Sequence, residues 1–108
     1  MTYDDVRELG KALPGVEDST WWGTAALKVK GKAMCRLKED GETLVLCTGS
    51  LWKEHLLKQH PDVFYVTDHY RNWPGVLVRL SLADPELMED LMLEVWRQVA
   101  PEKRIREF

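Results

Sequence analysis

Cysteine is scarce in this chain. Cys35 and Cys47 are the only two among 108 residues, too few for the disulfide framework of a small secreted domain and too few to build a structural zinc site alone. The histidines do not compensate, because His55 and His60 lie five positions apart and do not share one helix face as a metal-binding pair would. We therefore expect neither a disulfide nor a bound metal.

Long hydrophobic runs and clustered glycines are also missing. No segment approaches the roughly 20 apolar residues of a membrane-spanning helix, so no membrane association is predicted. The segment from Met1 to Gly10 carries acids where an export signal carries bases, which predicts a cytoplasmic protein. The seven glycines are scattered and form no phosphate-binding loop, and no nucleophile can be placed beside a base. The sequence therefore predicts no enzyme and no cofactor.

The composition is that of an ordinary globular domain. Hydrophobic residues make up 44% of the chain and charged residues 31%, which suits a buried core with a solvated surface. No repeat, low-complexity tract or linker interrupts the sequence, and 108 residues is a common domain size. We expect one domain spanning residues 1–108.

Apolar residues recur at helical spacing in the first and last segments and alternate with polar residues between them. Thr2 is placed to cap a first helix, and Asp84 is placed to cap a last helix that starts with Pro85. The pattern between predicts strands at 24–30, 32–39 and 42–48, a helix at 50–60 capped by Ser50, and extended segments at 62–67 and 75–82, with residues 16–23 as a loop. The order α-β-β-β-α-β-β-α predicts an α+β fold with helices on one face of an antiparallel sheet.

The two faces of that sheet are expected to differ. A hairpin turning at residues 40–41 places Cys35 opposite Leu46. It also puts Cys35 and Cys47 on opposite faces, whereas a one-residue bulge in the turn would bring the thiols together. One face carries Leu27, Val29, Cys35, Leu37, Leu44 and Leu46, and the other carries Lys28, Lys30, Arg36, Lys38 and Cys47. We expect this second face to meet water.

The second face is basic, since the segment from Ser19 to Lys38 holds five bases and no acid. Such cations can neutralise phosphates, and a nearby indole ring can stack on bases. The predicted nucleic-acid-binding residues are Lys28, Lys30, Lys32, Arg36, Lys38, Arg79 and Trp22. A net charge of −3 and a pI near 5.6 favour only weak, salt-sensitive binding, and lysines also serve as solvated strand positions that protect sheet edges.

A polar cluster after Asp68 provides an alternative site. An arginine can fork onto a phosphate or carboxylate, and tyrosine and histidine add donors, so the cluster could bind a small anion or a protein. The cluster consists of His69, Tyr70, Arg71 and Trp73. The "WPG" that closes it is also a turn signal, and large amphipathic rings commonly seal the end of a core.

Three stretches of the sequence carry a family resemblance. The segments "LPGVEDSTWWGTAALKVKGKAMCRL", "KEHLLKQHPDVFYVTDHYRNWPGVLVRL" and "DPELMEDLMLEVWRQVA" resemble the MmcQ/YjbR family of small bacterial proteins. The resemblance implies a frataxin-like (CyaY-like) α+β fold in a double-wing arrangement and a DNA-binding role, and it brings no enzyme activity and no catalytic residues. We therefore expect a non-enzymatic binding module, with nucleic acid as the named partner and the cluster at residues 69–73 as the alternative site.

Overall fold

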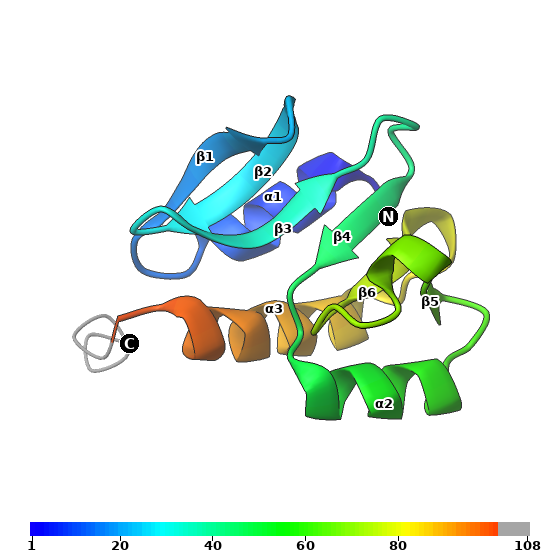
Figure 1. The fold of residues 1–108 in the computed structure, drawn as a ribbon. Coiled ribbons are helices and arrows are strands. Elements are labelled where there is room, and N and C mark those ends of the chain that lie inside the picture. The colour runs from blue at the N-terminus through cyan, green and yellow to red at the C-terminus, as the bar shows by residue number, and fades with distance from the viewer. Residues whose placement is uncertain (102–108) are drawn as a thin grey trace.

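The computed structural model describes residues 1–101. Six strands form one sheet in the order β1-β2-β3-β4-β6-β5, and every neighbouring pair is antiparallel (Figure 1). The elements are α1 (Tyr3–Lys11), β1 (Val16–Trp21), β2 (Thr24–Val29), β3 (Lys32–Leu37), β4 (Thr43–Leu46), α2 (Ser50–Gln59), β5 (Phe64–Tyr65), the 3-10 turn η1 (Asp68–Tyr70), β6 (Val76–Arg79), the 3-10 turn η2 (Leu80–Leu82) and α3 (Pro85–Val99). The predicted α+β fold with an antiparallel sheet is confirmed.

One strand was missed by the sequence. Residues 16–23 were predicted as a loop, but Val16–Trp21 form β1, the edge strand that pairs with β2, so the order is α-β-β-β-β-α-β-β-α. The strand is polar because it lies at an edge and buries only Val16. Its turn is also unusual, since Trp22 (φ 55) and Gly23 (φ 79) both take the left-handed conformation that a tight two-residue hairpin requires. Tryptophan rarely occupies that position, so the turn carried no clear signal.

The register of the β3–β4 hairpin is confirmed. Cys35 pairs with Leu46, as predicted from a turn at residues 40–41. The turn is fixed by Asp40, whose carboxylate accepts hydrogen bonds from the backbone N–H of Glu42 and of Thr43, both at 2.9 Å. Gly41 supplies the positive φ of 72°.

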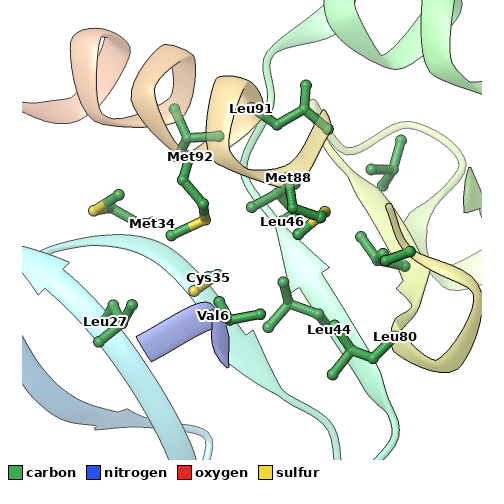
Figure 2. Packing of buried hydrophobic residues seen from close by; sticks show 14 of the residues in the cluster. Val6, Leu27, Met34, Cys35, Leu44, Leu46, Leu80, Met88, Leu91 and Met92 are labelled. Carbon is green, nitrogen blue, oxygen red and sulfur yellow. The ribbon is translucent and has the colours of Figure 1, made fainter. Parts of the chain in front are cut away.

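The core lies between the sheet and the helices. All three α-helices bury residues in one cluster, with Val6 from α1, Leu56 from α2 and a longer stripe from α3. Figure 2 shows Met88 and Met92 of α3 pointing toward Leu46 and Met34 of the sheet. The sheet residues of the cluster are Val16, Leu27, Val29, Met34, Cys35, Leu44, Leu46, Phe64, Val76 and Val78.

The second face of the sheet was predicted to meet water, but the structure buries part of it. A row of residues that pair across four strands is buried there: Ala26 (1% exposed), Arg36 (6%), Val45 (0%) and Leu77 (0%). The cover comes from the connection between β5 and β6, because the Tyr70 hydroxyl lies 3.4 Å from an Arg36 guanidinium nitrogen. The Lys38 ammonium lies 5.7 Å from the centre of the same tyrosine ring. This face is therefore partly enclosed.

The helix caps differ from the prediction at two of three ends. Thr2 forms a reciprocal capping box with Asp5, as expected. Asp84 does occupy the cap position of α3, but its side chain makes no capping hydrogen bond. Ser50 is the first helical residue of α2, and the cap residue is Gly49 with a φ of 83°.

The caps give a matched pair of stability predictions. Thr2→Ala removes the hydroxyl that accepts from the Asp5 backbone N–H but keeps the backbone N–H of residue 2 that donates to the Asp5 carboxylate, and it should lower the free energy of unfolding by about 1 kcal/mol. Asp84→Ala should cost clearly less, because no capping hydrogen bond is lost. Thermal melts of the two variants provide the measurement, and an Asp84 variant that loses more stability than the Thr2 variant would contradict this assignment.

Both thiols are free, and Cys47 departs from its predicted position. It was expected to point to the polar face, but β4 ends at Leu46, and Cys47 packs against the core cluster. Burial raises the pKa of each thiol, to about 12 for Cys35 and to about 12 for Cys47.

These pKa values predict alkaline destabilisation. A thiol that stays protonated in the folded chain but ionises in the unfolded chain stabilises the fold fully below its ordinary pKa of 9.0. That contribution is lost as the pH rises from about 9 toward about 12. Urea titrations at pH 8 and pH 10 should show lower stability at the higher pH, with a smaller loss in a Cys35→Ala, Cys47→Ala variant. An equal loss in that variant would assign the effect to other groups.

Candidate functional site

A cavity of about 550 Å³ lies on the second face of the sheet. Its lining comes from the β1–β2 turn, from β3 and its following turn, and from the connection between β5 and β6: Trp21, Trp22, Arg36, Glu39, His69, Tyr70 and Trp73. The cavity therefore unites residues that the sequence assigned to two different sites. Trp22 and Arg36 belonged to the predicted nucleic-acid surface, whereas His69, Tyr70 and Trp73 belonged to the alternative cluster.

Arg36 is the buried cation of this cavity. One guanidinium nitrogen donates to the Thr24 hydroxyl at 3.0 Å and to the Glu39 carboxylate at 3.2 Å, while the other donates to the Tyr70 hydroxyl at 3.4 Å. Burial alone lowers the pKa of Arg36, but its hydrogen bonds to Tyr70 and Glu39 outweigh burial and the net shift is upward. The pKa of Glu39 is lowered by a hydrogen bond from its own backbone and by Arg36. The cavity thus holds a permanent cation with an exposed carboxylate beside it.

Aromatic rings form the walls around Arg36. Tyr70 meets His69 edge to face with ring centres 4.9 Å apart, and it meets Trp73 in the same manner at 5.6 Å. Trp22 projects from the turn between β1 and β2 and is 77% exposed. An exposed indole beside a cavity offers a flat apolar surface for a ligand. Because the ring is exposed, it contributes little to the stability of the fold.

Lys53 holds the segment that carries two of these rings. Its ammonium donates to three backbone carbonyl oxygens, those of Tyr70 (3.2 Å), Arg71 (2.7 Å) and Trp73 (2.6 Å). Lys53 lies on α2, so this contact fixes the connection between β5 and β6 against a helix. Nothing in the sequence distinguished this lysine from Lys58, the other lysine of α2, because its partners are backbone atoms far along the chain.

Arg71 lies outside the cavity. Its side chain is 71% exposed and pairs with Asp68 at 2.6 Å, within the same 3-10 turn region. The sequence predicted Arg71 as the cation of the polar cluster. The arginine that lines the cavity is instead Arg36 of β3. Sequence spacing could not have shown this exchange, since Arg36 and Tyr70 lie 34 positions apart.

The other predicted basic residues are spread along the sheet. Lys30, with a φ of 50°, and Lys32 flank the β2–β3 turn and are exposed, and Lys28 is half-buried near the same end. Lys38 lies near Tyr70, at the other end of β3. Arg79 stacks over the Tyr65 ring at 4.0 Å and donates to the Asp62 carbonyl oxygen. These side chains do not line the cavity that contains Arg36 and Trp22.

Within residues 1–101 no group of three or more His, Cys, Asp or Glu side chains is arranged to hold a metal ion. No helix in the same described range has the length and apolar character needed to cross a membrane.

The family model YjbR matches residues 11–98, so the chain belongs to the YjbR family. The matched region contains every residue that lines the cavity. The family resemblance predicted from the sequence is thus confirmed.

Two mycobacterial proteins match part of the chain. The chain is 34% identical over 53 residues to uncharacterized protein Mb2600 of Mycobacterium bovis and to uncharacterized protein Rv2570 of Mycobacterium tuberculosis. Each match covers 49% of this chain and 41% of the relative. Among solved structures, the crystal structure of Deinococcus radiodurans protein DR2400, with a DUF419 domain, superposes with a TM-score of 0.74 at 23% identity. It covers 98% of this chain and 86% of that one, which establishes a shared fold.

Proposed function

We propose that this YjbR-family protein is a non-enzymatic binding module that takes a small, planar, anionic molecule in the cavity around Arg36. The observation that carries the proposal is a buried arginine, Arg36, which is 6% exposed in a cavity walled by aromatic rings. A cation in such surroundings is weakly hydrated, so an anion that reaches it forms a strong charge-assisted hydrogen bond. Of the two binding sites predicted from the sequence, this proposal favours the cluster at residues 69–73, with Arg36 as its cation.

Size and lining both suit a small ligand. A volume of about 550 Å³ falls within the range of roughly 300–1,000 Å³ common for small-molecule sites. Trp22 and Trp73 supply apolar surface for a flat ring, and Arg36 supplies the charge for a carboxylate or phosphate. Glu39 occupies one guanidinium nitrogen at 3.2 Å, so an incoming anion must compete with it.

Trp22→Ala is expected to weaken binding of a planar anion by about fivefold, because an aromatic contact contributes about 1 kcal/mol beyond burial. Sodium naphthalene-2-carboxylate is a suitable probe, with neutral naphthalene-2-carboxamide as its uncharged counterpart. Binding would be followed through the indole N–H resonances in NMR titrations. Trp22 is 77% exposed, so the variant should fold normally.

The control for that experiment is Arg71→Ala. Arg71 belongs to the same sequence cluster but pairs with Asp68 outside the cavity, so its removal should leave the affinity within about twofold. A carboxamide that binds as tightly as the carboxylate would overturn the anionic part of the proposal. If the Arg71 variant lost binding while the Trp22 variant bound as tightly as the wild type, the binding site would lie outside the cavity.

Glu39→Gln gives a prediction of opposite sign. Removing the carboxylate that pairs with Arg36 should strengthen binding of naphthalene-2-carboxylate by several fold, since the ligand no longer displaces a like-charged group. Glu39 is largely exposed, with 65% of its side chain accessible, so little stability depends on it. The matched control is Glu42→Gln, an exposed acid that does not line the cavity. Weaker binding in the Glu39 variant would show that the carboxylate serves the ligand instead of competing with it.

Nucleic-acid binding is the second candidate, and the exposed lysines at the β2–β3 turn are the observation in its favour. Lys28, Lys30 and Lys32 lie close together along the chain, although the net charge of −3 opposes tight binding. Changing these three lysines to glutamine should weaken DNA binding and flatten its salt dependence by roughly one unit of log–log slope per lost phosphate contact. Absence of binding to any duplex or single strand at low salt would remove this candidate.

We also propose that the sheet and its helices correspond to the frataxin-like, double-wing arrangement that the family resemblance implies. The supporting feature is an antiparallel sheet with all three α-helices contributing to one core cluster. Superposition on a frataxin structure provides the test, and a mismatch in strand order would refute the correspondence.

A further inference from the structure

A second cavity, of about 720 Å³, lies between α1 and α3, away from the site around Arg36. Both helices line it with residues at helical spacing. On α3 the lining residues Glu86, Glu89, Asp90 and Leu93 recur at i, i+3, i+4 and i+7, so they form one continuous stripe. Asp5, Glu8 and Leu9 of α1 and its C-cap residue Ala12 have the same spacing. The cavity is therefore a groove that runs along both helices.

The floor of the groove is apolar. Leu9, Leu13 and Leu93 are only half-buried although they pack against the core cluster. A leucine left partly exposed in a concave surface gains free energy when another apolar side chain covers it. Such a floor favours an occupant with an apolar stripe of its own.

The rims of the groove are acidic. Five carboxylates line it, those of Asp5, Glu8, Glu86, Glu89 and Asp90, and among residues 1–101 no lysine, arginine or histidine lines it with them. Asp5 is engaged by the capping box with Thr2, whereas Glu86, Glu89 and Asp90 are exposed along one side of α3. The charge along both rims therefore complements a partner with cations on either side of an apolar stripe.

We propose that the α1–α3 groove is a docking surface for a basic amphipathic helix of a partner protein. Leucine-sized side chains on one face of that helix would cover Leu9, Leu13 and Leu93, while flanking lysines or arginines would pair with the acids of the rims. The stripe from Glu86 to Leu93 spans about 11 Å, which is about two helical turns, so a helix of at least that length covers it. This interaction surface is separate from the proposed ligand cavity and does not depend on it.

The probe for this surface is a fluorescein-labelled peptide of about 14 residues, built from leucine and lysine with leucine at helical spacing. Fluorescence anisotropy at about 0.15 M salt reduces the contribution of exposed charges alone. The test variant is Glu86→Gln, Glu89→Gln, Asp90→Asn, which should weaken binding by about tenfold through three lost ion pairs. The matched control is Glu17→Gln, Glu42→Gln, Glu54→Gln, which removes the same charge from exposed positions outside the groove and should leave affinity within about twofold.

A scrambled peptide of the same composition tests the apolar stripe. It should bind at least about tenfold more weakly, because it cannot cover the leucine floor and present its cations to both rims together. Equal binding of the scrambled peptide, or equal loss in the two triple variants, would reduce the effect to net charge and overturn the proposal. Self-association of the chain in sedimentation runs that disappears in the groove variant would also overturn it, since the occupant would then be a second copy.

Discussion

Gly75→Ala is expected to abolish most ligand binding in the Arg36 cavity and to lower the free energy of unfolding by about 1–3 kcal/mol. Gly75 is buried, and a Cβ placed there would meet Cζ3 of the Trp73 ring and would lie 2.5 Å from the Leu46 carbonyl oxygen. The carbonyl belongs to β4 and cannot move without disturbing the sheet. The indole would therefore be pushed out of its place in the cavity wall.

A double substitution separates the ring clash from other causes. Trp73→Leu shortens the side chain that the new Cβ would strike, so Gly75→Ala should cost less in that background than in the wild type. Urea titrations of the two single variants and the double variant form the cycle. Simple additivity of the losses would mean that Trp73 is not what Gly75 accommodates, and the strand contact with Leu46 would carry the whole effect.

Lys53→Met is expected to lower stability by about 2 kcal/mol and to weaken ligand binding without removing any residue from the cavity. The ammonium of Lys53 satisfies three carbonyl oxygens in the segment that carries Tyr70 and Trp73. Methionine keeps much of the apolar stem but offers no donor, so those carbonyls must turn to water and the segment loses its tie to α2.

Hydrogen exchange gives the discriminating measurement for Lys53. Amides of residues 68–75 should exchange faster in the Lys53→Met variant, while those of the β1–β2 hairpin should not. Lys58→Met is the matched control, because Lys58 is exposed on the same helix and should leave both stability and exchange unchanged. Unaltered exchange in residues 68–75 of the Lys53 variant would show that the segment is held by its rings alone.

Local patterns were sufficient for most of the elements. The Asp40–Gly41 turn signal gave the β3–β4 register, with Cys35 opposite Leu46, because a short loop leaves few alternative pairings. The apolar stripe after Pro85 likewise gave α3. The edge strand β1 was not predicted, because five of its six residues are not fully buried and it lacks the alternation by which strands are recognised.

The candidate site was only half predictable. His69, Tyr70 and Trp73 were singled out as a cluster from adjacent positions, and Arg36 and Trp22 were singled out as part of a basic surface. Their meeting in one cavity could not be predicted, because it requires the β5–β6 connection to fold back over β3. The groove between α1 and α3 also combines residues from opposite ends of the chain.

By itself, the sequence determined the family, through three stretches spread over most of the chain. It also determined the α+β class and the β3–β4 register, since these depend on residues close together in the chain. Only the tertiary structure decided which charged residue becomes the cation of the site. The sequence alone does not distinguish Arg36 from Arg71, but in the structure Arg36 is buried beneath Tyr70 and Arg71 is exposed beside Asp68. The physical reason is that burial is set by contacts between distant segments, and local spacing carries no information about which segment will cover a given face.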